Sequence, residues 1–170
     1  MGHAKGPDKV KLIVSLISKD TAIFPQARKL LENKYGTITF ESRTLDFNHT
    51  EYYEKEMGAN LKRIFYAFDG LFSPKNLYEA KVVSNSLEER FSANGKRTVN
   101  IDPGYISLSK LVLFSTKDFT HRIYLGDGIY GEITLYYKNN TFNAWPWTYP
   151  DYKTPEYIEM FNKIRATIGA

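Results

Sequence analysis

The order of hydrophobic patterns along the chain constrains its fold more than any other feature. In the first half, strand-like and helix-like patterns follow one another as strand, helix, strand, strand, helix. These segments are Val10 to Ser18, Thr21 to Tyr35, Thr37 to Phe47, Leu61 to Phe68, and a helix from Ser73-Pro74 to Asn94-Gly95. The strand pattern at Val99 then completes a β-α-β-β-α-β order. The simplest fold with this order is a ferredoxin-like split β-α-β sheet.

From Arg97 onward the pattern is almost entirely that of strands, before a last helix that begins at Thr154-Pro155. The strands are Val99 to Ile101, Lys110 to Ser115, Arg122 to Leu125 and Ile129 to Tyr137, with turns at Asp102-Pro103-Gly104, Gly126-Asp127-Gly128 and Asn139-Asn140. The sequence therefore predicts an α+β protein. Its ferredoxin-like sheet is extended by an antiparallel β-meander and is followed by a C-terminal helix. Residues 1–8 read as a flexible tail and 9–170 as a single domain.

Composition excludes several classes of function. The chain has no cysteine, which removes disulfides, thiolate nucleophiles and zinc ribbons. No run reaches the roughly 18 apolar residues of a membrane span, so a cytoplasmic protein is expected. The net charge is +4, yet five basic and five acidic residues balance between Arg97 and Tyr152. A nucleic-acid surface is therefore not supported. Cofactor and oligomeric state are left undetermined.

The densest polar cluster, Thr116 to Arg122, joins two predicted strands and supplies the catalytic candidates. His121 can transfer protons near neutral pH, and Asp118 could orient it. Asp102 could act as a base at the edge of the sheet. The structural alternatives are an ordinary polar hairpin loop around His121 and a simple turn at Asp102.

Ligand-binding candidates surround this cluster. Basic side chains can bind an anion, and the aromatic segment Trp145 to Tyr152 can form one wall of a pocket or cover the edge of the core. The candidates are Lys110, Lys117, Arg122, Tyr105, Glu132, Trp147 and Tyr149. No spacing gathers the carboxylates into a metal site, and no P-loop is present because the sequence before Gly95-Lys96 fails the motif.

Several phrases resemble one uncharacterised bacterial family, domain of unknown function 4416, whose members are often labelled GTP-binding proteins. They are Val99-Asn-Ile-Asp-Pro-Gly-Tyr, Lys110-Leu-Val-Leu, Thr116-Lys-Asp, His121-Arg-Ile-Tyr-Leu-Gly-Asp-Gly-Ile-Tyr, Pro146-Trp-Thr-Tyr-Pro-Asp-Tyr and Glu51-Tyr-Tyr-Glu-Lys-Glu-Met-Gly. The resemblance spans roughly Val10 to Ile168. It implies no established activity, and the GTP label has no P-loop or complete guanine motif behind it here.

Three functional hypotheses follow. The first is a protein that binds a small anion or nucleotide in a pocket of mixed charge lined by aromatic residues. The second is an enzyme that uses His121 with Asp118 or Asp102 in acid–base or phosphate chemistry. The third is an RNA-binding or protein-interaction module that presents aromatic rings on its sheet.

Overall fold

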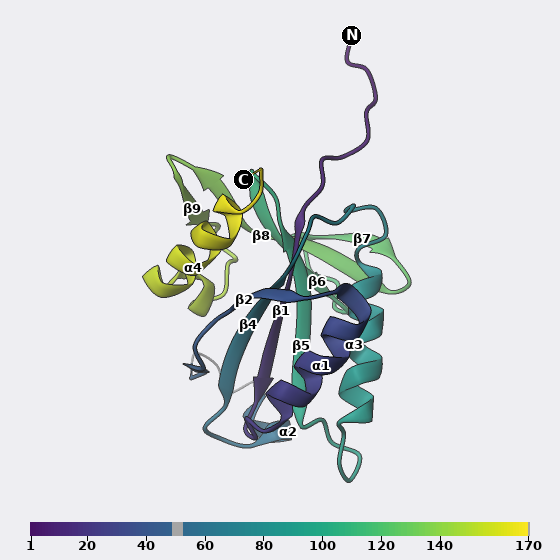
Figure 1. The fold of residues 1–170 in the computed structure, drawn as a ribbon, viewed down its shortest axis with the longest axis vertical. Coiled ribbons are helices and arrows are strands. Elements are labelled where there is room, and N and C mark those ends of the chain that lie inside the picture. Colours follow the sequence, from purple (N-terminus) through teal and green to yellow (C-terminus); the bar gives the residue numbers. More distant parts are fainter. Residues whose placement is uncertain (49–52, 170) are drawn as a thin grey trace.

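The computed structural model describes residues 1–48 and 53–169, in which nine strands form one sheet with helices on both faces (Figure 1). The strands are β1 (Lys11–Ser18), β2 (Ile38–Glu41), β3 (Leu45–Asp46), β4 (Lys62–Phe68), β5 (Val99–Ile106), β6 (Lys110–Ser115), β7 (Arg122–Gly126), β8 (Ile129–Lys138) and β9 (Thr141–Ala144). The helices are α1 (Ile23–Tyr35), α2 (Glu54–Met57), α3 (Glu79–Arg90) and α4 (Pro155–Ala166), with a short 3-10 turn, η1 (Asp151–Lys153), before α4. The predicted α+β class, with an antiparallel sheet and a C-terminal helix, is confirmed.

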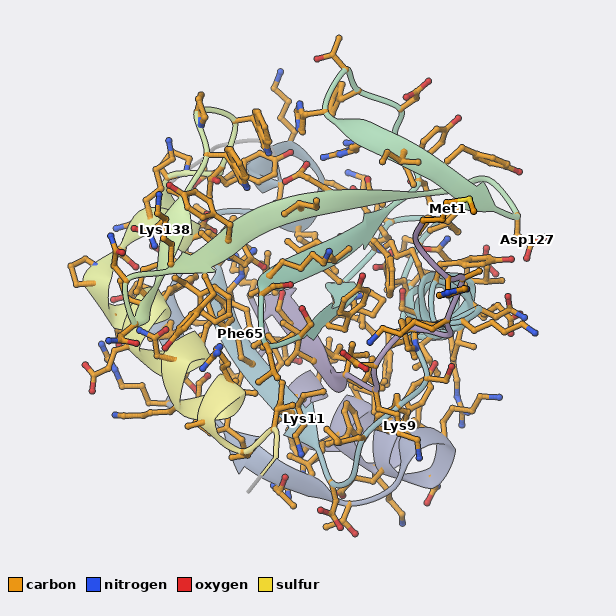
Figure 2. The ribbon with its side chains drawn as sticks, turned by 90° about the horizontal axis from the view of Figure 1, so that it is seen from above. Met1, Lys9, Lys11, Phe65, Asp127 and Lys138 are labelled. Atoms are coloured by element: carbon orange, nitrogen blue, oxygen red, sulfur yellow. The ribbon has the colours of Figure 1, made fainter. Side chains whose placement is uncertain are left out.

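Strand β1 lies inside the sheet, in the order β2-β4-β1-β5, and its alternating side chains separate two cores. Leu12 and Val14 pack with α1 and α3 on one face, whereas Ile13 points to the opposite face, toward α4. On that second face Phe65, labelled in Figure 2, meets Phe161 of α4 with ring centroids 5.4 Å apart. Because both faces of β1 are covered, its sequence is a nearly continuous apolar run.

Helix boundaries follow the capping residues at α4 but not at α3. Thr154 caps α4 through its side chain, and Pro155 is the first helical residue, as predicted. Helix α3 begins at Glu79, several residues after the predicted start at Ser73-Pro74. The intervening Asn76 has a φ of 60°, a left-handed conformation that an α-helix cannot contain.

The predicted strand from Thr37 to Phe47 is divided into β2 and β3. Between them the Phe65 N–H donates to Ser42 Oγ at 2.9 Å, so a side chain takes the place of a backbone carbonyl in the ladder. Glu51 and Tyr52, which begin the phrase Glu51-Tyr-Tyr-Glu-Lys-Glu-Met-Gly, lie outside the described residues. The described part of that phrase contains α2.

The predicted turn at Asp102-Pro103-Gly104 is wrong, because these residues lie inside the continuous strand β5. Strand β5 pairs with β1 along its whole length, but with β6 only from Gly104 onward. Pro103 can occupy this strand because it sits where β6 has not yet joined and no ladder donor is needed. At Gly104 the two strands approach closely: an added Cβ would lie 2.3 Å from the Val112 carbonyl oxygen. Proline and glycine here mark the point where two strands separate.

In the second half of the sheet the strands are arranged around β8 and do not follow the chain order expected of a β-meander. It pairs with β6 along one edge, and with β7 and then β9 along the other. The spatial order is therefore β6-β8-β7 and not the chain order. Asp127, in the turn before β8, and Lys138, its last residue, lie at opposite ends of the molecule in Figure 2. Both predicted hairpin turns are confirmed, with positive φ at Asp127, Asn139 and Asn140.

Candidate functional site

A cavity of about 450 Å³ lies where β5 and β6 separate. Its walls come from α3, from the first half of β5, from the end of β6 and from the loop that follows. Residues of β4, β7 and β8 and the segment before α4 complete it. The cavity thus occupies the space that a fully paired sheet would have closed.

Two charged side chains of α3 take the place of β6 along the open edge of β5. Glu88 Oε1 accepts the Ile101 N–H at 2.7 Å, and Lys81 Nζ donates to the Ile101 carbonyl oxygen at 2.9 Å. Both side chains are buried. Because these backbone groups are satisfied without β6, the strands can separate here at no cost in lost hydrogen bonds.

Lys81 is also the centre of a buried ionic network in one wall of the cavity. It donates to Asp102 Oδ1 at 3.1 Å, and Asn100 Nδ2 donates to Asp102 Oδ2 at 2.5 Å. Burial alone would raise the pKa of Asp102, but the charge of Lys81 and these hydrogen bonds hold that pKa below its ordinary value. Arg97 extends the network, donating to Asn100 Oδ1 at 3.1 Å and pairing with Glu88 at 3.2 Å.

A second network surrounds Glu132 of β8, which is only 2% exposed. Its Oε2 lies 3.0 Å from His121 Nε2 and accepts from Arg122 Nε at 2.9 Å. Arg122 is held further by Ser115 Oγ and by the Lys117 carbonyl oxygen, each at 2.9 Å. This guanidinium is therefore fixed in position before any ligand arrives.

A third buried ion pair, Arg63 with Asp151, closes the inner end of the cavity. Both side chains are 5% exposed, and the guanidinium carbon lies 4.6 Å from the centroid of Phe47 and 5.3 Å from that of Tyr152. Aromatic faces stabilise the cation, and Asp151 neutralises it. The pair supplies a polar end to a region that is otherwise an aromatic core.

Three neutral polar groups in the cavity lining have no hydrogen-bond partner within the residues that the structure describes. They are the hydroxyls of Thr116 and Tyr152 and the amide of Asn85. Tyr152 is buried, Asn85 is half-buried and Thr116 is exposed, so these groups extend from the inside of the cavity to its opening. They can bond a ligand without breaking an existing contact.

Half of the predicted site residues line this cavity. Asp102, Lys117, Arg122, Glu132 and Tyr149 come together from separate segments of the chain. Outside its lining are Tyr105, Lys110, Asp118, His121 and Trp147. His121 stays connected to the cavity through Glu132, which is its carboxylate partner in place of the predicted Asp118.

The predicted residues that lie outside the cavity lining contact other parts of the protein or solvent. His121 is stacked between Phe119 and Trp147, with centroids 6.0 Å and 5.5 Å away. Trp147 donates its indole N–H to the Ile133 carbonyl oxygen at 3.2 Å. Tyr105 packs against Phe114, and burial raises the pKa of Tyr105. Asp118 is exposed, and Lys110 pairs with β8 at the other end of β6.

Sequence reasoning missed five charged residues of the cavity wall, of which all but the half-buried Arg97 are buried: Arg63, Lys81, Glu88, Arg97 and Asp151. One signal in the sequence indicated the buried charges of α3. Lys81, Ser84 and Glu88 fall on the same helical stripe as the apolar residues of α3, where charged residues are unexpected. Arg63 likewise interrupts a strand whose other face and neighbours are apolar.

Comparisons with known proteins identify a family and no activity. A family model described as a domain of unknown function (DUF4416) matches residues 8–167. Searches of curated proteins and of solved structures gave no match. Within residues 1–48 and 53–169, no group of three or more His, Asp or Glu side chains is arranged to hold a metal ion. No helix of this part of the chain combines the length and apolar content of a membrane span.

Proposed function

The chain belongs to the DUF4416 family, and we propose that it binds a small anionic ligand, up to the size of a nucleotide, in the cavity between β5 and β6. The observation that carries this proposal is the concentration of buried ion pairs around one accessible space. Arg63 with Asp151, Lys81 with Asp102, and Arg122 with Glu132 all line it.

Buried ion pairs of this kind contribute little net stability to a fold. Removing two charges from water costs more than their attraction usually returns, and apolar residues of equal volume would hold the fold at least as well. Charged groups that converge on a cavity are therefore a sign of binding or catalysis. The volume of about 450 Å³ falls within the range of small-molecule pockets.

The charges of the lining favour an anion. Its basic residues are Arg63, Lys81, Arg97, Lys117 and Arg122, and its acidic residues are Glu88, Asp102, Glu132 and Asp151, an excess of one positive charge. Lys117 and Thr116 are exposed near the opening, so the anionic end of the ligand binds there. Asn85 and Tyr152 offer hydrogen bonds farther in to its uncharged part, and the exposed ring of Tyr149 offers a stacking surface.

A thermal-shift screen tests the proposal. The panel contains inorganic phosphate, nucleoside mono- and triphosphates including GTP, sugar phosphates and dicarboxylates at millimolar concentration. A ligand at 100 times its Kd adds about 2.7 kcal/mol, which for a chain of this size raises the Tm by roughly 5–10 °C.

Lys117→Ala should weaken binding about tenfold, because it removes one charged contact. Lys138→Ala is the matched control, since this exposed lysine lies at the far end of β8 (Figure 2). The proposal fails if no compound in the panel stabilises the protein, or if both variants weaken binding equally.

A second candidate is an enzyme that performs acid–base chemistry in the same cavity. The observation in its favour is the 3.0 Å contact between His121 Nε2 and Glu132 Oε2, because Glu132 itself lines the cavity. The imidazole would hold and orient the Glu132 carboxylate from the side away from the cavity. Once a turned-over substrate is known, His121→Asn should change the pH profile of kcat while the KM is retained. An unchanged profile would remove His121 from the chemistry.

We also infer that the first half of the sheet is a ferredoxin-like unit. The strand order β2-β4-β1-β5, with α1 and α3 packed on one face, supports this inference. In such a unit the far edge of β5 is free to take additional strands, and here β6 adds to only half of it.

A further inference from the structure

The outer edge of the sheet carries exposed apolar side chains that the cavity does not use. Strand β7 ends the sheet, and in the described part of the chain its outer edge pairs with no other strand (Figure 1). Ile123, Tyr124 and Leu125 of β7 are 70%, 59% and 40% exposed, and Ile133 of β8 is 38% exposed. We call these four residues the apolar edge. Exposed edges of this kind pair with other chains unless charged residues or prolines block them, and none lies between Ile123 and Leu125.

Three of the four side chains form one continuous aliphatic surface. Ile123 is opposite Gly131 in the β7–β8 register, and Ile133 follows Gly131 on the same face. Leu125 covers the glycine, since a Cβ added to Gly131 would lie 3.0 Å from Leu125 Cδ1. Tyr124 points to the opposite face and packs on Tyr130, with centroids 5.4 Å apart. Both faces of the edge therefore present apolar groups.

The backbone of β7 is open at the centre of this edge. Arg122 donates its N–H to the Phe119 carbonyl oxygen and not to β8. Tyr124, two residues later, consequently directs its own N–H and C=O outward, because successive residues of a strand alternate between its two edges. Tyr124 thus offers one donor and one acceptor to a new strand.

We propose that β7 pairs antiparallel with β7 of a second copy of this chain, about a two-fold axis at Tyr124. Two copies of Tyr124 placed opposite each other exchange N–H···O=C bonds in both directions, as a hydrogen-bonded antiparallel pair requires. Counting outward from the axis, Ile123 meets Leu125 of the second copy, apolar against apolar. The strand is therefore complementary to itself in apolar contact.

The exposed area of the apolar edge approaches the apolar share of a standard interface. At roughly 200 Å² for a fully exposed residue of this size, the four side chains of the apolar edge present about 400 Å² per copy. A standard interface buries about 800 Å² per partner, of which somewhat more than half is apolar. The apolar edge alone supplies nearly all of that apolar share. This proposal does not depend on ligand binding in the cavity.

A single-cysteine cross-link tests the axis, because the chain has no cysteine of its own. Hydrogen-bonded antiparallel partners have Cα atoms about 5.5 Å apart, which lies within the range of a disulfide. Tyr124→Cys should form a covalent dimer under mild oxidation. Leu108→Cys, at an exposed position in the turn between β5 and β6, should not. Equal cross-linking of both variants, or none at position 124, would overturn the proposed axis.

Sedimentation equilibrium tests the dimer itself. The wild-type chain should show a mass about twice 19.7 kDa at high micromolar concentration. Ile123→Lys should be monomeric with an unchanged circular-dichroism spectrum, since this side chain is 70% exposed and its loss leaves the core intact. Leu108→Lys should remain dimeric. A monomeric wild-type protein would overturn the proposal, as would a dimer that survives Ile123→Lys. A wild-type chain that is monomeric on its own and pairs through β7 only with a different protein would also overturn the proposal.

Discussion

Replacing Asp151 by asparagine isolates the energetic cost of the buried charges at the inner end of the cavity. The substitution keeps the side-chain oxygen that accepts the Tyr152 N–H at 2.9 Å, but removes the charge that neutralises Arg63. The guanidinium has no access to water, because it is 5% exposed and enclosed by aromatic rings. Breaking a buried pair of this kind costs about 3–5 kcal/mol, a large part of the total stability of a domain.

Urea denaturation followed by circular dichroism measures this loss. With a slope of about 2 kcal/mol per molar urea, Asp151→Asn should lower the midpoint by roughly 1.5–2.5 M. Asp118→Asn, at an exposed loop position, should leave the midpoint unchanged. The double variant Arg63→Met with Asp151→Asn should recover most of the loss, since it removes the orphaned cation. A midpoint shift no larger than that of Asp118→Asn would refute the reasoning, and so would a double variant less stable than the single one.

Two further predictions concern β5. Gly104→Ala should destabilise the protein by several kcal/mol in the same urea assay, because the new Cβ would lie 2.3 Å from the Val112 carbonyl oxygen. Gly6→Ala is the control and should have no effect, since its new Cβ would meet nothing within 4 Å. Asp102 has a pKa below its ordinary value of 3.8 in the folded protein, so its ion pair with Lys81 stabilises the fold at neutral pH and is lost as the pH falls through that lowered value. Asp102→Asn should therefore flatten the loss of stability below about pH 5. An acid limb identical to the wild type would show that this carboxylate is not stabilised by Lys81.

The elements that local sequence determines were predictable. Thr154 and Pro155 start α4 where expected, and the turn at Asp127 needs only residues that tolerate positive φ. The family resemblance is likewise confirmed. The helix start and the turn each depend on a few neighbouring residues and on no distant contact.

The features that depend on distant contacts were not predictable. Prediction from neighbouring residues alone places a turn at Pro103 and Gly104. They can belong to a strand only because β6 separates from β5 at this point. Strand β8 lies between β6 and β7, and it is long enough to pair with both β7 and β9 along one edge. Helix α3 starts late because Asn76 adopts a left-handed conformation that propensity alone does not specify.

The candidate site likewise contains residues that could be predicted from the local sequence and residues that could not. Of the predicted polar cluster from Thr116 to Arg122, Lys117 and Arg122 line the cavity. Lys81 and Glu88 were absent from the prediction because charged residues on a helix are normally solvated, and only the open edge of β5 explains their burial. The pairing of His121 with Glu132 and not with Asp118 depends on the β7–β8 register, in which Arg122 lies opposite Glu132.

The measurement that most directly tests the central claim is an NMR titration of ¹⁵N-labelled protein with inorganic phosphate and with nucleoside monophosphates. If the cavity between β5 and β6 is the binding site, the largest amide shifts should fall on Asn85, on Thr116 and Lys117, and on Tyr152. Amides near Lys138, at the far end of β8, should not move. Saturable shifts confined to another surface, or no shifts with any of these compounds, would contradict the account.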